Sequence, residues 1–284
     1  MHIDYITPND WSIIEDGWNP NNVKSSESLM ALGNGAMGQR ANFEEDYSGA
    51  TFQGSYIGGV YYPDKTRVGW WKNGYPEYFA KVLNAPSWIG IKVTVNGESL
   101  DLHTCKEVKD FRRELDMKAG VLYRSFKATL QNDVEIAVKA TRFLSMEMDE
   151  VGAIKYEVTP INVDATISYE PYLDSGITNE DSNWDDKFWN TTNVNSKGNR
   201  AFIEAYTMKT NFATCTFMQA SAEVNATRIL ASEIENTEFV TGCEFQHNLK
   251  KGEIISLIKF GGYTVSRNHK DTELTNIANS VLDK

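Results

Sequence analysis

The sequence predicts an all-β protein, a large antiparallel β-sandwich, from three observations. Apolar and polar residues alternate with a period of two through most of the chain, which is the pattern of half-buried strands. Turn-forming Asn, Asp and Gly residues recur about every ten residues between these stretches, as in antiparallel sandwiches. An amphipathic helical pattern is clear only at the carboxyl end. The predicted sandwich domain therefore spans residues 1–265.

The first turn candidate is Gly-Asn-Gly-Ala-Met-Gly at 33–38, which matches the letters of the G-x-G-x-x-G dinucleotide fingerprint. That fingerprint needs a buried strand before it, a helix after it and an acidic residue about 20 positions further on. Residues 25–32 are not a Val- and Ile-rich strand, and neither a helical stripe nor the acidic residue follows. We interpret 33–38 as a tight turn between short strands at 29–32 and 36–39, without a nucleotide.

The clearest hairpin lies in WIGIKVTVNGESLDL, residues 88–102, where alternating apolar positions flank Asn96-Gly97. Asn-Gly between two such stretches is a strong hairpin signal because both residues reach positive φ at low cost. Further strands are predicted at 111–117, 121–129, 134–143, 151–159, 165–173, 201–208, 212–219, 238–248 and 253–260. The last of these is apolar on both faces, which predicts a strand buried inside the sandwich.

The carboxyl end carries a helical pattern instead. Its apolar residues follow the i, i+3, i+4, i+7, i+8 spacing and are Leu274, Ile277, Ala278, Val281 and Leu282. Asp271 is placed to cap this helix at its amino end. An apolar stripe needs a surface to pack on, so the helix is expected either to fold back on the sandwich or to lead into a further domain.

Composition narrows the class of protein. The net charge is −11 and basic residues form no cluster, which argues against nucleic acid or an anionic membrane as a partner. The three cysteines, Cys105, Cys215 and Cys243, are far apart and are expected to be reduced and structural. The histidines have no metal-ligand spacing, so neither a metal nor an organic cofactor is expected. The first thirty residues lack a signal-peptide core, and the expected location is cytoplasmic.

Two aromatic-rich segments, 51–79 and 179–190, are candidates for contact with a sugar. Aromatic faces beside polar groups suit the C–H faces and hydroxyl groups of a sugar ring. We expect these segments to be loops with exposed rings. The candidates for a substrate rim are Trp70, Trp71, Tyr75, Trp184 and Trp189. The competing interpretation, that most of these rings belong to the core or anchor the loops, stays open.

Several acidic residues are candidates for a catalytic pair, because glycoside cleavage uses two carboxyl groups at a set separation. The available residues are Glu44, Glu45, Asp46, Asp185 and Asp186. Neighbours in sequence point to opposite sides of a strand or lie exposed in a turn. These carboxylates are therefore expected to be solvated surface groups, and the residues of this chain predict no catalytic set.

The stretch ESLMALGNGAMGQRANFEE, residues 27–45 and here called the hallmark segment, resembles the amino-terminal hallmark of glycoside hydrolase family 65. The upstream WSIIEDGWNP, the block 52–93 and FRRELDMKAGVLYRSF continue the resemblance over nearly the whole chain. The block 52–84 is similar to the maltose phosphorylase branch of that family. The residues that carry over are structural ones: Asn34, Gly35, Gly38 and Arg40.

The resemblance implies a galactose mutarotase-like super-sandwich, a helical linker beginning within 266–284, and an (α/α)6 barrel beyond Lys284. It also implies inverting phosphorolysis of a disaccharide, maltose and phosphate giving β-glucose 1-phosphate and glucose. The acid Glu and the phosphate-binding residues lie in the barrel in that family, so no catalytic residue is expected here. Phosphate would be a co-substrate. The fragment alone is expected to be inactive, to support its own barrel, to contribute to a homodimer and to lend a loop to the active-site rim.

Two other interpretations stay open. A free-standing sugar epimerase of the mutarotase type shares the super-sandwich shape, and its chemistry needs a histidine acid and a carboxylate base around one pocket. His103 or His247, together with a glutamate, would have to supply them. A carbohydrate-binding module without catalysis is the second alternative.

Overall fold

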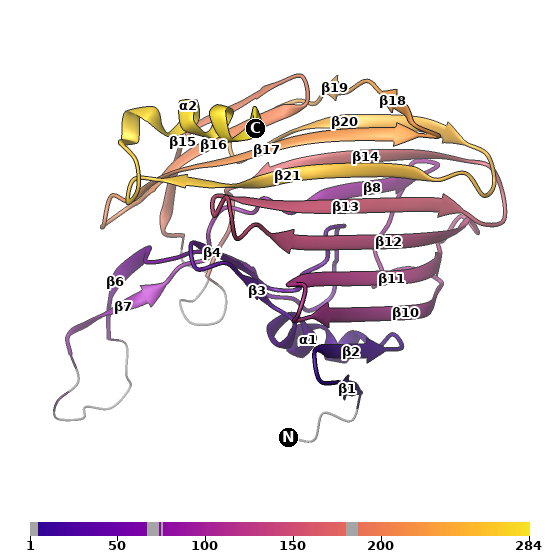
Figure 1. Ribbon diagram of the computed structural model, residues 1–284, viewed down its shortest axis with the longest axis horizontal. Coiled ribbons are helices and arrows are strands. Elements are labelled where there is room, and N and C mark those ends of the chain that lie inside the picture. Colours follow the sequence, from indigo (N-terminus) through magenta and orange to yellow (C-terminus); the bar gives the residue numbers. More distant parts are fainter. Residues whose placement is uncertain (1–4, 67–73, 75, 180–186) are drawn as a thin grey trace.

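The computed structural model describes residues 5–66, 74, 76–179 and 187–284. Long antiparallel strands form two sheets that face each other, with a helix at each end of the chain (Figure 1). The larger sheet has 11 strands in the order β1-β2-β10-β11-β12-β13-β21-β17-β16-β15, with β18 paired to β17. The smaller facing sheet has five, in the order β19-β20-β14-β8-β9. The predicted all-β sandwich is confirmed.

The strands of the large sheet are β1 (Ile6–Pro8), β2 (Ser12–Asp16), β10 (Glu107–Asp116), β11 (Val121–Thr129), β12 (Glu135–Leu144), β13 (Val151–Pro160), β15 (Trp189–Lys197), β16 (Arg200–Thr207), β17 (Ala213–Val224), β18 (Thr227–Ile229) and β21 (Ile255–Val265). The facing sheet contains β8 (Ile91–Val95), β9 (Glu98–Ser99), β14 (Ala165–Asp174), β19 (Ser232–Glu233) and β20 (Val240–Leu249). Alternate residues of both sheets point inward and form the core.

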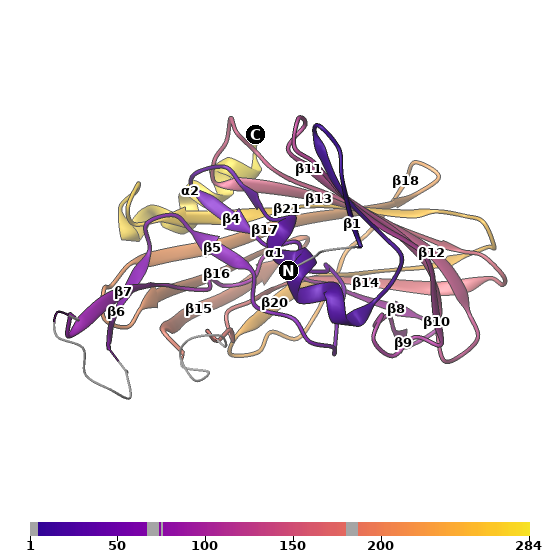
Figure 2. The ribbon, with the colours of Figure 1, turned by 90° about the horizontal axis from the view of Figure 1, so that it is seen from below.

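Short elements cover the ends of the sandwich. They are the 3-10 helices η1 (Pro20–Asn22) and η2 (Asp271–Glu273), the helices α1 (Val23–Leu29) and α2 (Leu274–Leu282), and the small strands β3 (Leu32–Gly33), β4 (Met37–Gln39), β5 (Ser55–Ile57), β6 (Tyr61–Lys65) and β7 (Tyr78–Val82). The β6–β7 hairpin projects from one end of the sandwich (Figure 2). Within the described residues, no helix has the length and apolar character to cross a membrane.

Most strand predictions are confirmed because their signals are local. β11 covers the predicted range 121–129, and β12, β13, β14 and β16 agree to within a residue at each end. The hairpin turn between β8 and β9 has positive φ at both central residues, 52° at Asn96 and 82° at Gly97.

Three local predictions are wrong. Residue 29 ends α1, so only Leu32–Gly33 forms a strand before the turn. β21 is not buried on both faces: Ile258 and Phe260 are 37% and 42% exposed on the outer side of the sheet. Asp271 lies in η2 and does not cap α2, whose N-cap position is Glu273. In each case the local pattern is present in the sequence, but packing against neighbouring elements decides which residues are buried and where each element begins and ends.

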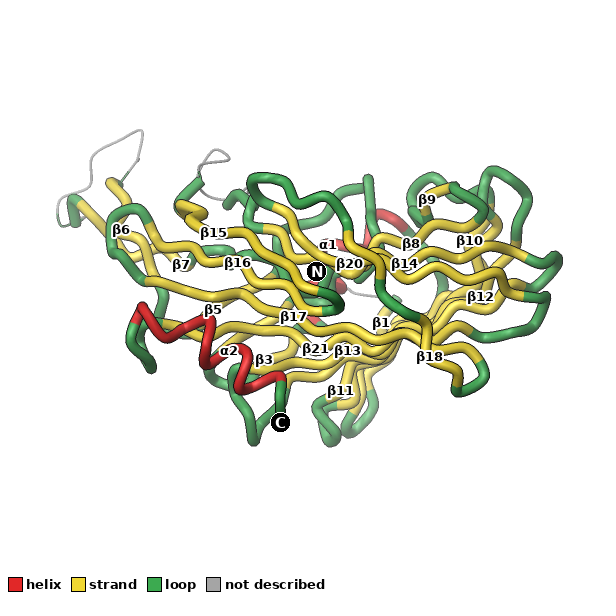
Figure 3. Tube along the Cα trace, turned by 90° about the horizontal axis from the view of Figure 1, so that it is seen from above, coloured by secondary structure: helices red, strands yellow, loops and turns green. Residues whose placement is uncertain are grey.

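The helix α2 folds back on the sandwich. Leu274, Ala278 and Val281 pack with Phe202 and Phe217 on the outer side of β16 and β17 (Figure 3). The last turn of this helix is held by Arg200, whose Nη2 donates to the Leu282 carbonyl at 3.3 Å and to Asp283 Oδ1 at 2.7 Å. The apolar stripe of the helix is therefore covered by the sandwich itself.

The three cysteines, all within the described residues, are free thiols. Burial raises the pKa of the Cys215 and Cys243 thiols to about 12 and that of Cys105 to about 11. Thiols with pKa values this high carry almost no thiolate at neutral pH, so all three act as packing residues.

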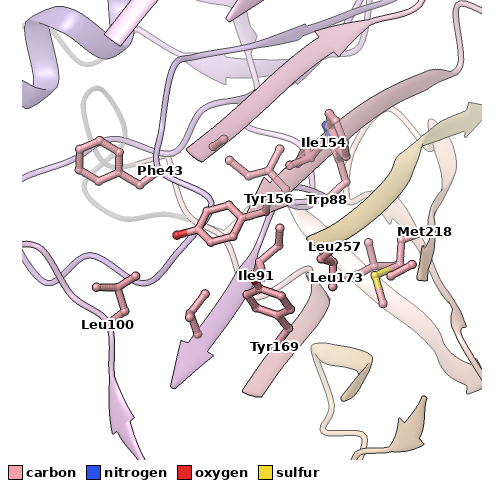
Figure 4. Packing of buried hydrophobic residues seen from close by; sticks show 14 of the residues in the cluster. Phe43, Trp88, Ile91, Leu100, Ile154, Tyr156, Tyr169, Leu173, Met218 and Leu257 are labelled. Atoms are coloured by element: carbon pink, nitrogen blue, oxygen red, sulfur yellow. The ribbon is translucent and has the colours of Figure 1, made fainter. Parts of the chain in front are cut away.

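The core is centred on aromatic residues between the sheets, among them Trp88, Tyr156 and Tyr169 (Figure 4). Trp88 is fully buried against two glycines, Gly152 of β13 and Gly261 of β21, which are opposite each other in the ladder. A Cβ added at Gly152 would lie 2.6 Å from the indole ring, and one at Gly261 would lie 2.8 Å from it. Both positions are glycine because the indole occupies the space of a side chain.

Replacing Gly261 with alanine is expected to lower the free energy of unfolding by about 1–3 kcal/mol, because the added methyl group overpacks a rigid site. Urea unfolding followed by tryptophan fluorescence measures this. Gly33→Ala is the matched control: its Cβ would meet its nearest neighbour only at 3.8 Å, so a change within about 0.5 kcal/mol is expected. Equal effects of the two substitutions would contradict the close packing of Trp88.

Candidate functional site

The hallmark segment begins in the last turn of α1 and continues into the turn between β3 and β4. Asn34 Oδ1 accepts hydrogen bonds from the backbone N–H groups of Ala36 and Met37, at 3.1 and 2.9 Å. Asn34 Nδ2 donates to the carbonyls of Ser145 and Asp149, at 2.8 and 3.0 Å, in the connection between β12 and β13. The asparagine thus closes its own turn and ties it to the large sheet.

The other hallmark residues also have structural surroundings. Gly35 has a φ of +90°, where a side chain would be strained. A Cβ at Gly38 would meet only ordinary contacts at 3.8 and 3.9 Å, so the packing does not explain glycine at this position. Arg40 Nη2 donates to Ser28 Oγ at 2.6 Å and to the Lys24 carbonyl at 3.2 Å, which fixes the segment to α1.

The next residues of the segment meet a set of buried charges. Glu44 and Glu45 are each 3% exposed. The guanidinium of Arg124 binds both of them: Nη2 lies 2.6 Å from Glu44 Oε2, and Nη1 lies 2.5 Å from Glu45 Oε1. Arg142 Nη1 lies 3.2 Å from Glu44 Oε1. The expectation that these two carboxylates are solvated is wrong, because the inward-facing arginines of the large sheet require buried counter-charges.

We call Arg113, Arg124 and Arg142, together with Glu15, Glu44 and Glu45, the arginine cluster. Its arginines come from the adjacent strands β10, β11 and β12, and Arg113 Nε lies 3.3 Å from Glu15 Oε2. The ring of Phe43 lies beside two guanidiniums, 4.9 Å from that of Arg113 and 4.6 Å from that of Arg124. Cation–π contacts therefore stabilise the cluster together with its ion pairs.

The ion pairs favour the charged forms of Glu44 and Arg124. Burial opposes the charge on Glu44, yet Arg142 and Arg124 hold the pKa of that carboxyl below its usual value. Burial also opposes the charge on Arg124, and Glu45 and Glu44 raise its pKa above the ordinary range. The Tyr156 hydroxyl donates to Glu45 Oε2 at 3.0 Å. In Figure 4 this hydroxyl points toward the side where Phe43 lies. Glu44 is thus held as an anion at neutral pH, where it serves the fold.

A cavity of about 570 Å³ lies next to the cluster, between Glu27 and residues 39–55 on one side and, on the other, residues 87–90 before β8, residues 99–104 and the end of β14. Six of its lining residues are acidic: Glu27, Glu44, Glu45, Asp46, Asp101 and Asp174. Among the described residues that line it, none is Lys, Arg or His. The described lining is therefore rich in carboxylates, two of which, Glu44 and Glu45, are paired with arginines.

Three of these carboxylates accept one or two hydrogen bonds each around the cavity. Asp46 Oδ1 accepts a long hydrogen bond of 3.4 Å from the Tyr172 hydroxyl, and Asp174 Oδ1 accepts one of 2.7 Å from the Gly176 N–H. Asp101 accepts from the backbone N–H groups of Ser48 and His103. Burial raises the pKa of Asp46, with Lys92 opposing it, and burial raises the pKa of Asp174.

One amine near the cavity, that of Lys259, lies behind its wall. Lys259 is fully buried, and its Nζ donates to the carbonyls of Gly90 at 2.7 Å and Tyr172 at 2.8 Å, both of which line the cavity. Burial lowers the pKa of Lys259 well below its usual value. It holds two strands together and does not supply a charge to the cavity.

The aromatic rim candidates fall into two groups. Trp70, Trp71, Tyr75 and Trp184, like Asp185 and Asp186, lie outside the described residues. Trp189 opens β15, is 6% exposed, and donates its Nε1 hydrogen to the Asn84 carbonyl at 2.7 Å. The expectation of an exposed ring is wrong for Trp189, because the segment that carries it joins the large sheet.

The histidines considered for epimerase chemistry do not converge on the cavity. His103 Nδ1 lies 3.1 Å from Ser48 Oγ, beside the cavity, and His247 is exposed on β20. The described residues contain no group of three or more His, Cys, Asp or Glu side chains arranged to hold a metal ion. The cavity offers hydrogen-bond acceptors and aromatic surface. Its described lining contains no histidine side chain.

Sequence reasoning missed this site because its parts lie far apart along the chain. A signal was nevertheless present. Arg113, Arg124 and Arg142 occupy positions that the period-two pattern turns toward the core. Charged residues at inward positions imply buried partners of opposite charge, and the adjacent acids of the hallmark segment were available.

Comparisons with known proteins show what the chain resembles. Residues 13–284 match the family model described as glycosyl hydrolase family 65, N-terminal domain. The chain is 40% identical over 274 residues to maltose phosphorylase of Bacillus subtilis (strain 168), which covers 96% of this chain and 35% of that protein. It is 27% identical over 296 residues to α,α-trehalose phosphorylase of Thermoanaerobacter brockii, covering 97% and 37%.

A solved structure described as "Putative kojibiose phosphorylase from human microbiome" has the same fold. It superposes with a TM-score of 0.83 at 24% sequence identity, and the match covers 98% of this chain and 36% of that chain. The chain spans about a third of the length of these relatives.

Arg124→Leu is expected to lower the free energy of unfolding by about 3–5 kcal/mol at neutral pH, because it leaves two buried carboxylates without their main partner. Glu44, whose folded pKa is lowered, contributes stability above its ordinary pKa of about 4.3 that is lost as pH falls through the folded value. The loss caused by the substitution should therefore shrink in acid. Lys106→Met, which breaks an exposed pair with Asp133, is the control and should cost less than about 1 kcal/mol. A cost at Arg124 as small as at Lys106 would contradict the role of the cluster.

Asp46→Asn is expected to leave the protein at least as stable as the wild type at pH 7. The folded pKa of Asp46 is raised, so its ionised form disfavours folding at neutral pH, and this cost disappears below the ordinary pKa of about 3.9. The advantage of the variant should therefore fall as the pH is lowered toward 4. Thermal unfolding between pH 4 and pH 7 measures it, and a variant that is less stable at pH 7 contradicts the assignment.

Proposed function

The chain belongs to glycosyl hydrolase family 65 as its N-terminal domain, and we propose that it is the sandwich domain of a phosphorylase that acts on maltose. The family match covers nearly the whole chain. The proposal for maltose rests on the 40% identity to a maltose phosphorylase over 96% of the chain. It also rests on the resemblance of block 52–84 to that branch of the family.

The observation that carries the proposed division of labour is the charge of the cavity. Phosphorolysis requires a site for inorganic phosphate, and proteins hold phosphate with Arg, Lys or backbone N–H groups. The described lining of the cavity contains six carboxylates and no basic side chain. A phosphate dianion is repelled there, so the reaction belongs elsewhere in the whole protein.

The chemistry of phosphorolysis determines which groups the rest of the protein must supply. A phosphate oxygen attacks the anomeric carbon, the bond from that carbon to the glycosidic oxygen breaks, and a carboxylic acid transfers its proton to that oxygen. Inversion at the anomeric carbon gives β-glucose 1-phosphate from an α-linked disaccharide. Glu44 is unsuited to be this acid because its arginine partners keep it ionised. We place the acid and the phosphate site in an (α/α)6 barrel beyond Lys284.

The other roles remain proposals. The sandwich, residues 1–265, would support the barrel, and 266–284 would begin the linker, although α2 packs on the sandwich. Trp70, Trp71, Tyr75 and Trp184 stay candidates for the substrate rim. Homodimer formation and a cytoplasmic location also stay predictions. The epimerase interpretation is disfavoured because no histidine is found among the described residues that line the cavity.

The 284-residue chain, incubated with maltose and phosphate, is expected to release no β-glucose 1-phosphate above background. The same assay in the synthetic direction, with β-glucose 1-phosphate and glucose, should also be negative. A protein extended beyond Lys284 to the length of the maltose phosphorylase relative is the positive control and should catalyse both directions.

Turnover by the 284-residue chain that is lost in Asp46→Asn or Asp174→Asn would overturn the division of labour. An extended protein that cleaves maltose to two glucose molecules without consuming phosphate would overturn the assignment as a phosphorylase.

A further inference from the structure

We propose that the acidic cavity beside the arginine cluster is a binding site for a neutral saccharide, and that it rejects sugar phosphates. The proposal does not rest on the phosphorylase assignment, because it concerns a site within the sandwich and a binding step without bond cleavage. It assigns a ligand class to the cavity that the hallmark segment helps to line.

The size and shape of the cavity fit a small ligand. Its volume of about 570 Å³ lies within the range of about 300–1,000 Å³ that is usual for small-molecule sites. The rings of Tyr47, Phe52 and Tyr172 form part of its lining. Aromatic faces of this kind pack against the C–H face of a pyranose, and their apolar area is then removed from water.

The polar lining is almost entirely made of acceptors. Each carboxylate has about four lone-pair sites. Asp46 uses one of them for the Tyr172 hydroxyl, and Asp174 uses one for the Gly176 N–H. Both carboxylates therefore have acceptor capacity left. Ligands rich in hydroxyl donors satisfy such a lining, whereas an apolar ligand would leave the carboxylates desolvated and unpaired.

Charge decides between the remaining ligand classes. The described lining carries no basic side chain, and the guanidiniums behind Glu44 and Glu45 are already engaged by those two carboxylates. An anionic ligand such as a sugar phosphate meets carboxylates and finds no basic side chain in the described lining to bind it. A metal ion is disfavoured because the described residues offer no set of three or more ligating side chains at metal distance.

Two further observations support a ligand site over a merely structural one. The Tyr47 hydroxyl is shielded from solvent and has no hydrogen-bond partner among the described residues. Burial raises the pKa of Tyr47, so the hydroxyl stays protonated and can donate to a ligand oxygen. Burial raises the pKa of Asp46 and of Asp174, and carboxyl groups with perturbed pKa values that line a cavity are candidates for a functional site.

Isothermal titration and saturation-transfer NMR on the 284-residue chain test the proposal, with glucose, maltose, glucose 1-phosphate and inorganic phosphate as probes. We expect saturable binding of glucose or maltose, and binding of glucose 1-phosphate that is weaker by tenfold or more. Asp46→Asn should weaken saccharide binding by about tenfold, the loss of a hydrogen bond to a charged acceptor. Its stability makes it a usable variant, and Glu238→Gln, at an exposed carboxylate outside the cavity, should bind as the wild type does.

A second variant keeps the test independent of Asp46. Ser99 is exposed at the cavity, and Ser99→Arg adds the cation that the described lining lacks. This variant should narrow or reverse the preference for glucose over glucose 1-phosphate. The proposal is overturned if neither neutral saccharide binds saturably, if glucose 1-phosphate binds as tightly as glucose, or if Asp46→Asn and Ser99→Arg leave both affinities unchanged.

Discussion

The buried arginine cluster is the interaction on which the other features depend. Three adjacent strands point guanidiniums into the core, and an unpaired buried guanidinium costs several kcal/mol. Glu44 and Glu45 supply the counter-charges, so the hallmark segment can lie in only one place on the inner face of the large sheet. The turn at Asn34 and the contact of Arg40 with α1 hold its earlier part to the same path. Residues 46–55 then leave the sheet and form one wall of the cavity.

The fold was predictable where the signals are local. The Asn96-Gly97 turn and the alternating strands depend on residues close in sequence, and their positions came out correctly. The site was not predictable in the same way, since Arg124 and Glu45 are 79 positions apart and neither residue alone indicates the other. Trp189 shows the reverse error: a polar neighbourhood suggested a loop, but pairing with β16 makes its segment a strand. Covering elements also decide exposure, as the outer residues of β21 show.

The proposed function assigns two tasks to different parts of the protein. Phosphate needs a basic site, whereas the cavity of the sandwich is lined with carboxylates and carries no basic side chain among its described residues. The buried arginines, which could otherwise bind phosphate, form ion pairs with Glu44 and Glu45 inside the core. Fold stability and anion rejection thus arise from the same charges. A cavity of this kind can hold a neutral sugar while the co-substrate is bound by another part of the protein.

Native-state hydrogen exchange tests the central claim, that the cluster fixes the hallmark segment to the large sheet, most directly. Three backbone amides report on this attachment. The N–H of Arg40 donates to the Gly54 carbonyl, that of Ala41 to the Glu27 carbonyl, and that of Ile91 to the Glu44 carbonyl. The account predicts that they exchange only with global unfolding, at the same opening free energy as the central amides of β11 and β12. Opening free energies lower than those of the strands by about 2 kcal/mol or more would show a segment that detaches on its own, and would contradict the account.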